Sequence, residues 1–170
     1  MAPRRSVWLM PAQADTLTLH KMTQSLRAAF GGPLFSPHLT VMGALPARAD
    51  MLDEIAAFAQ QHEAMRVPVI GPEGGDRYHR CVYLRVAASA ALLALRQSVF
   101  EAFQVAPDAY LPHVSLLYAD LCMAEQAAAV SMVTSWPSTI ALTSLAVVET
   151  SGAAETWASV GEFVLAGNDR

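Results

Sequence analysis

The sequence has few charged residues and no long apolar run. Charged side chains make up 15% of the 170 residues, with 11 Lys plus Arg against 15 Asp plus Glu and a net charge of −4. Proteins that bind a long nucleic acid usually carry a clustered excess of basic residues. No stretch approaches the roughly 18 consecutive apolar residues of a membrane-spanning helix. The composition therefore favours a small ligand and predicts neither a long nucleic acid nor a membrane as partner.

Cysteine is also scarce, because the chain has only Cys81 and Cys122. Two cysteines could form one disulfide, and neither has zinc-site spacing to a pair of histidines. We expect two buried free thiols. The N-terminal apolar run stops at Pro11 and is too short for a secretory signal peptide. We therefore expect a cytoplasmic protein, and a monomer.

Hydrophobic periodicity and turn residues predict alternating strands and helices, and hence an α+β fold. Strands are expected at residues 6–10, 38–42, 67–70, 80–86, 113–118, 140–149 and 157–165. Helices are expected at residues 14–29, 50–62, 89–104 and 123–133. The glycine-rich segment from Gly71 to Asp76 is expected to be a turn-rich connection.

Two short patterns recur at a common offset of 75 residues. Val7-Trp8-Leu9 corresponds to residues 82–84, Val-Tyr-Leu. Residues 37–41, Pro-His-Leu-Thr-Val, correspond to residues 112–116, Pro-His-Val-Ser-Leu. Because both pairs share one offset without a gap, the distance from strand to motif is the same in each half.

The repeat predicts one bilobal domain over residues 1–170, with halves at about 5–70 and 80–165. Two copies are too few for an extended repeat array, which needs at least three. We therefore expect two pseudo-symmetric lobes around a central cleft, each an antiparallel-rich sheet with helices on its outer face.

Strand alternation determines which motif side chains can act together. Residues i and i+2 of a strand point to the same face, so His38 shares a face with Thr40 and His113 with Ser115. The apolar residues between them point the other way. Two histidines and two hydroxyls can then line one cleft.

This set of groups suits the hydrolysis of a phosphodiester. One imidazole can take a proton from water while the other gives a proton to the leaving oxygen, because histidine titrates near neutrality. Hydroxyl donors from Thr40 and Ser115 can hold the non-bridging phosphate oxygens. A zinc site would want a third protein ligand, and no Asp or Glu lies near either motif on the same face. We therefore expect no metal or other cofactor, and we expect His20, His62 and His79 to be solvated.

The paired motifs resemble those of the two-histidine (2H) phosphoesterase superfamily. Residues 35–41, Phe-Ser-Pro-His-Leu-Thr-Val, and residues 113–118, His-Val-Ser-Leu-Leu-Tyr, are similar to the two motifs of its plant and yeast cyclic phosphodiesterase family. Residues 6–11 and 78–84 are similar to the strands that precede them. The resemblance covers nearly the whole chain, from Ser6 to Phe163.

The resemblance implies metal-independent hydrolysis of a small cyclic phosphodiester, either a nucleoside 2′,3′-cyclic phosphate or ADP-ribose 1″,2″-cyclic phosphate. It implies that His38 and His113 are the acid–base pair and that Thr40 and Ser115 bind phosphate. The near-symmetry leaves both role assignments open, and we take His113 as base and His38 as acid.

The same resemblance implies that Trp8 lines the pocket and that the Tyr118 hydroxyl contacts phosphate. Trp8 lies on the side of its strand opposite Val7 and Leu9. Tyr118 is an odd number of residues after His113, so only a bulge or a strand end would bring it to the same face.

Two alternatives stay open. One is a branch of the same superfamily that acts on RNA 2′,3′-cyclic ends or has 2′–5′ ligase-like activity. The net charge of −4 disfavours a long RNA but not a short oligonucleotide. The other is a non-catalytic nucleotide-binding module, although binding alone does not require two proton-transfer groups.

Overall fold

The structure, a computed structural model, describes residues 4–167 and has the predicted α+β fold. Its strands are β1 (Arg4–Pro11), β2 (Leu39–Pro46), β3 (Met65–Gly74), β4 (Val82–Val86), β5 (His113–Leu117), β6 (Thr139–Glu149) and β7 (Ala158–Val164). Its α-helices are α1 (Gln13–Phe30), α2 (Met51–Gln61), α3 (Ala90–Ala102) and α4 (Met123–Met132). Single 3-10 turns occur at Tyr78–Arg80 and Ala154–Thr156. Each α-helix and strand falls within a few residues of a predicted one, except at the end of β3.

All strand pairs of the sheet are antiparallel, in the order β1-β2-β5-β4-β3-β6-β7, and β1 also pairs with β6. We call β2-β1-β6-β7 the first arc and β5-β4-β3 the second arc. The first half of β6 pairs with β3, which joins the arcs on one side. On the other side β2 and β5 are joined only at Leu39 and Val114. The arcs therefore separate where the two motifs lie.

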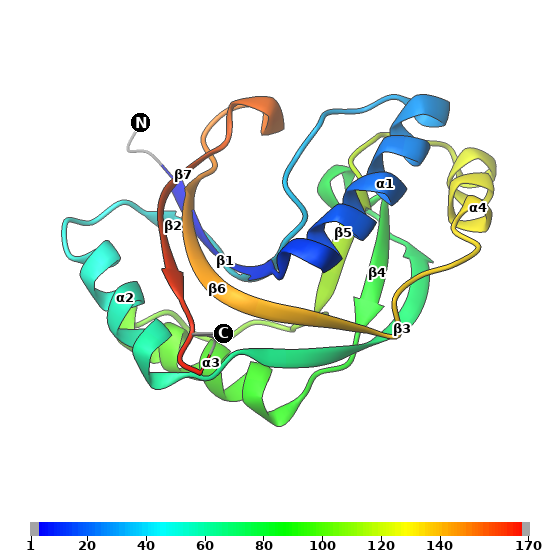
Figure 1. Ribbon diagram of the computed structural model, residues 1–170. Coiled ribbons are helices and arrows are strands. Elements are labelled where there is room, and N and C mark those ends of the chain that lie inside the picture. The colour runs from blue at the N-terminus through cyan, green and yellow to red at the C-terminus, as the bar shows by residue number, and fades with distance from the viewer. Residues whose placement is uncertain (1–3, 168–170) are drawn as a thin grey trace.

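The two halves of the sequence exchange their third strands. β3, from the first half, pairs with β4, whereas β6, from the second half, pairs with β1. One helix of each half is exchanged as well, because α1 packs with α4 on the second arc and α3 packs with α2 on the first. These helix pairs lie on different sides of the curved sheet (Figure 1). Among the described residues, no helix is both long enough and apolar enough to span a membrane.

The apolar residues of the motif strands face the helices, as alternation predicts. Leu39, Val41, Val114 and Leu116 are all buried in the main hydrophobic core. A side chain on the opposite face of β2 or β5 therefore points toward the concave side of the sheet. His38, Thr40 and Ser115 are next to these core residues in sequence, so the core determines which way they face.

The expected turn at Gly71 to Asp76 is corrected by the structure, because β3 continues to Gly74. Pro72 pairs with Leu84 and Glu73 with Tyr83 on β4. Glycine and proline disfavour a strand locally, but a neighbouring strand supplies hydrogen-bond partners that a local pattern does not reveal. The extension brings Glu73 onto the second arc.

The prediction of two buried thiols holds for one cysteine only. Both cysteines are free, but Cys81 is buried and Cys122 is exposed. Cys122 is the residue before α4, where its backbone N–H donates to the Glu125 side chain at 2.9 Å. An N-cap position lies at the end of a helix, which is why this thiol stays in contact with solvent.

Candidate active site

The four motif side chains gather where β2 meets β5. Continuing the antiparallel register from Leu39 and Val114 by one residue on each side places His38 beside Ser115 and Thr40 beside His113. The positive charge of His113 also lowers the pKa of His38, which indicates that the two rings are close. The structure therefore brings together the two histidines and two hydroxyls that the sequence predicts.

Each histidine is held in the same way. His38 Nδ1 donates to the carbonyl oxygen of Ser36 at 2.6 Å, and His113 Nδ1 donates to that of Leu111 at 2.7 Å. A carbonyl oxygen only accepts hydrogen bonds, so Nδ1 carries the proton in both rings. Nε2 is left as the proton-transfer atom of each ring.

Burial lowers the pKa of both imidazoles. His38 is 6% exposed, and burial lowers its pKa to about 4, helped by the charge of His113 and opposed by the hydrogen bond to Ser36. The pKa of His113 is also lowered by burial, with a smaller contribution from the charge of Arg80. Because the cost of burying a charge is larger at His38, this ring is the less often protonated of the two at a given pH.

Trp8 lies directly against His38. The two rings stack with their centroids 3.5 Å apart and their planes 6° apart. Trp8 is paired with Thr40 across β1 and β2, so both side chains face the concave side. The structure places Trp8 at the site, as the resemblance implies.

The second arc repeats this arrangement with tyrosine in place of tryptophan. Tyr83 pairs with Ser115 across β4 and β5, and its ring lies 5.2 Å from that of His113. The Tyr83 hydroxyl donates to Glu73 at 2.9 Å. The Tyr83 ring therefore packs against His113, and its hydroxyl already makes a hydrogen bond within the protein.

The two hydroxyls differ in their partners. Ser115 Oγ donates to the carbonyl oxygen of His79 at 2.9 Å. Within residues 4–167 the structure gives Thr40 Oγ1 no hydrogen-bond partner, while the Thr40 carbonyl oxygen accepts from the Tyr110 hydroxyl at 3.1 Å. Thr40 is therefore free to bind a ligand at once, whereas Ser115 must release His79 first.

Tyr118 reaches the site because β5 ends at Leu117. Beyond the strand the alternation no longer applies, and Tyr118 turns inward, where its side chain is 2% exposed. Its ring stacks on Phe35 with the centroids 3.8 Å apart. Burial raises the pKa of Tyr118, and the nearby Ser115 hydroxyl opposes the rise. Tyr118 is thus a protonated hydroxyl beside Ser115.

Gly32 allows the segment before β2 to approach Tyr118. Its φ is +97°, and a Cβ there would lie 2.5 Å from the Tyr118 carbonyl oxygen. Both the left-handed backbone and the close contact require glycine. This approach brings Phe35 onto the Tyr118 ring.

Sequence reasoning missed Phe35 and Tyr110, which occupy equivalent positions three residues before each histidine. Each crosses to the opposite motif: Phe35 stacks on Tyr118, and Tyr110 donates to Thr40. Their common offset of 75 residues is a signal in the sequence that could have found them. These two contacts connect the segments that carry His38 and His113.

His79 was expected to be solvated, but its ring packs in an aromatic cluster. It lies 5.4 Å from the Trp157 ring and 5.1 Å from the Tyr118 ring. Burial lowers its pKa although the residue as a whole is exposed. Trp157, in the connection between β6 and β7, was also missed, since no motif marks it.

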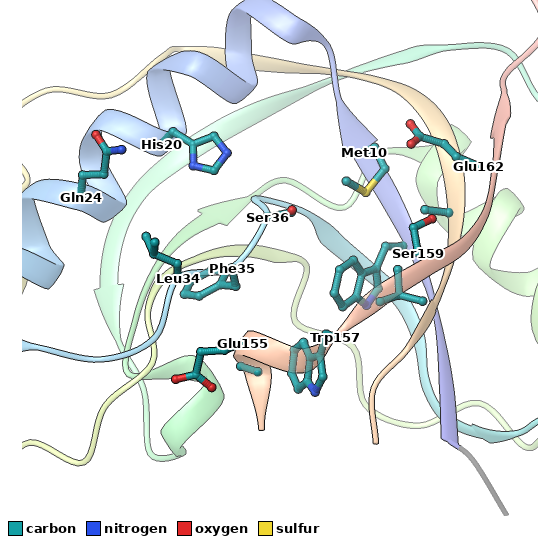
Figure 2. Close-up of a pocket in the computed structure, with 14 residues that line it drawn as sticks. Met10, His20, Gln24, Leu34, Phe35, Ser36, Glu155, Trp157, Ser159 and Glu162 are labelled. Carbon is teal, nitrogen blue, oxygen red and sulfur yellow. The ribbon is translucent and has the colours of Figure 1, made fainter. Parts of the chain in front are cut away.

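A pocket of about 390 Å³ opens beside Trp8 on the first arc, and we call it the Trp8 pocket. Figure 2 shows His20 and Gln24 on the α1 side, Met10 and Glu162 across from them, and Glu155 with Trp157 at a third side. Its wall includes Phe35 and Ser36, so it adjoins His38. His20 is therefore half-buried in a pocket wall rather than solvated.

Across residues 4–167, no three His, Cys, Asp or Glu side chains are grouped closely enough to hold a metal ion. The two motif histidines have hydroxyls and aromatic rings around them instead. The donor set is that of a proton-transfer site that binds an anion.

Comparison with known proteins gives a consistent result. A family model described as cyclic phosphodiesterase-like protein matches residues 1–165. A cyclic phosphodiesterase of Arabidopsis thaliana is 28% identical over 123 residues, which cover 71% of this chain and 68% of that protein. The fold is similar to that of E. coli LigT in complex with 3′-AMP, with a TM-score of 0.62 at 14% identity over 97% of this chain and 99% of LigT. LigT in complex with ATP matches with a TM-score of 0.64 at 14% identity, over 96% and 97% of the two chains.

Proposed function

The chain belongs to the cyclic phosphodiesterase-like protein family, and we propose that it hydrolyses a small cyclic phosphodiester with two histidines and no metal. The substrate is of the nucleoside 2′,3′-cyclic phosphate or ADP-ribose 1″,2″-cyclic phosphate type. One observation supports this most strongly: both motif histidines donate through Nδ1 to a backbone carbonyl two residues earlier. Each therefore presents Nε2 beside a hydroxyl of the opposite motif.

The chemistry follows from these groups. A water molecule attacks phosphorus and gives its proton to Nε2 of one histidine. A new P–O bond forms, and the bond from phosphorus to one ribose oxygen breaks. Nε2–H of the other histidine protonates that leaving oxygen, while Thr40, Ser115 and Tyr118 donate to the non-bridging oxygens.

We assign the base to His38 and the acid to His113, which reverses the assignment made from the sequence. The pKa of His38 is about 4, so at neutral pH this ring is almost entirely neutral and ready to accept a proton. The pKa of His113 is lowered by burial as well, but His113 is less buried than His38. A general acid must carry a proton at the working pH, and His113 stays protonated to a higher pH than His38.

The assignment predicts an acidic optimum for kcat/KM. The base acts when deprotonated, so the rate falls as pH drops through about 4. The acid acts when protonated, so the rate falls as pH rises through the His113 pKa, which lies below 6.5. A pH series of kcat/KM with a stable cyclic nucleotide checks this, because that parameter reports the free enzyme. A plateau that extends above pH 7.5 would contradict the assignment.

The alternatives make different predictions. LigT has been crystallised with 3′-AMP, NADP+ and ATP, so its fold accepts several small nucleotides. An RNA-end enzyme would show binding that weakens steeply with salt, because each phosphate contact releases counterions. A binding module would bind the cyclic substrate and its opened product equally, without turnover.

A panel of cyclic phosphates tests the proposal directly. We expect the purified protein to open at least one nucleoside 2′,3′-cyclic phosphate or ADP-ribose 1″,2″-cyclic phosphate at an undiminished rate in excess chelator. Phosphorus NMR identifies the product and the bond that breaks. Loss of all activity in chelator would refute the metal-independent mechanism, and binding without hydrolysis of any compound would favour the module.

A further inference from the structure

The Trp8 pocket is continuous with the motif of the first arc. Cross-strand pairing runs from Thr40 to Trp8, from Trp8 to Ala146, and from Ala146 to Glu162. Paired residues of antiparallel strands share a face, so these four side chains form one row on the concave side. The row spans three strand spacings, roughly 14 Å. Within it Ala146 is the small side chain, which leaves room for a ligand.

The walls of the pocket suit a flat ring. Trp8 and Trp157 lie with their ring centroids 5.9 Å apart and their planes 57° apart. Phe35 and Met10 complete the apolar surface. His38 covers one face of Trp8, which is 5% exposed, so the half-buried Trp157 is the ring on which a nucleobase can stack.

The permanently charged side chains of the pocket are both acidic, beside neutral polar residues that include His20 and Gln24. Glu155 and Glu162 are the charged side chains of the lining, and none of the lining residues is Lys or Arg. Glu162 accepts a hydrogen bond from the buried Ser144 hydroxyl, which holds one carboxylate oxygen in place. A carboxylate accepts hydrogen bonds and repels phosphate, so it suits an N–H donor.

The opposite side of the site carries arginines, which the Trp8 pocket lacks. Arg85 pairs with His113 across β4 and β5, and the charge of Arg80 lowers the His113 pKa. Each arginine forms an ion pair that partly neutralises its charge. Arg85 pairs with Glu73 at 3.4 Å, and Arg80 pairs with Asp76 at 2.6 Å. The site is therefore asymmetric in charge although its motifs are symmetric.

We propose that the Trp8 pocket binds the nucleobase of the substrate and selects bases that carry an exocyclic amino group, with Glu162 as the acceptor. This inference rests on the proposed function, since it assumes a cyclic phosphate held between His38 and His113. Cytosine and adenine offer an amino group, whereas uracil offers a carbonyl oxygen at the corresponding position. The same two carboxylates disfavour a further phosphate in this pocket.

Cytidine and uridine 2′,3′-cyclic phosphates test the selection, because they have the same sugar and phosphate. We expect kcat/KM to favour the cytidine compound by about tenfold, since a site built to accept a hydrogen bond rejects an analogue that lacks the donor. Glu162→Gln should abolish this preference. Ser144→Ala should reduce it without changing the charge. Glu101→Gln, an equal charge change on α3, should leave it intact.

Binding of the opened products separates this proposal from the proposed function. Calorimetry with cytidine and uridine 2′-phosphates measures base selection without turnover. A Glu162-dependent preference for the cytidine product, with no hydrolysis of any cyclic phosphate, would support the pocket and refute the activity. Hydrolysis of both compounds with equal kcat/KM, or an unchanged preference in folded Glu162→Gln, would refute the pocket and leave the activity standing. An absence of both preference and hydrolysis would refute both.

Discussion

Replacing either motif histidine is expected to lower kcat for cyclic phosphate hydrolysis by about 10²- to 10⁴-fold, the range that a positioned acid or base contributes. His38→Ala removes the proposed acceptor of the water proton, and His113→Ala removes the proposed donor to the leaving oxygen. KM should change little, because the phosphate is held by hydroxyls. Initial rates at saturating substrate give the effect.

Two comparisons show whether the loss reflects proton transfer. His62→Ala, at the end of α2 away from the cleft, should keep full activity. The double variant should be hardly slower than either single variant, because residues that act as one unit lose activity non-additively. Since His38 stacks on Trp8, thermal unfolding of His38→Ala must be measured as well. Full activity in a folded His38→Ala or His113→Ala protein would disprove the mechanism.

Removing a phosphate-binding hydroxyl is expected to cost about 10²- to 10³-fold in kcat, as the loss of one oriented donor does. Thr40→Val keeps the shape of the side chain and deletes only the hydroxyl, so it is the cleaner variant. Ser115→Ala also breaks the hydrogen bond to the His79 carbonyl oxygen, and its effect includes any movement of the Tyr78–Arg80 turn.

The conservative exchanges provide the matched controls. Thr40→Ser and Ser115→Thr keep a hydroxyl at each position and should recover most of the rate. Steady-state kinetics on all four variants separates kcat from KM. If Thr40→Val raised KM at constant kcat, the hydroxyl would bind the ground state and transition state equally, and its proposed role would be wrong.

The strand geometry of the site could be predicted from the sequence because it is local. Alternation alone places His38 with Thr40 and His113 with Ser115, and it sends the apolar residues between them into the core. The structure shows those residues buried. The shared offset of 75 residues likewise predicted the order of elements, since each half has the same spacing from strand to motif.

Other parts of the site depend on pairing between distant segments. The strand character of Gly71 to Gly74 comes from β4, and the inward turn of Tyr118 comes from the end of β5 and its contact with Phe35. The exchange of β3 and β6 between the arcs is of the same kind, because either pairing satisfies the local pattern equally well. No periodicity within one segment encodes which partner it will meet.

What the sequence by itself determined, then, is which side chains of the two motifs share a face, because backbone geometry ties side-chain direction to residue number. Only the tertiary structure decided how those groups differ. Burial lowers the pKa of His38 to about 4, whereas the less buried His113 has a smaller shift. Ser115 is tied to His79 while Thr40 is free, and carboxylates lie on the Trp8 side while Arg80 and Arg85 lie beside His113. Solvent exclusion and charge at a site depend on what packs around it, and segments far apart in the chain supply that surrounding.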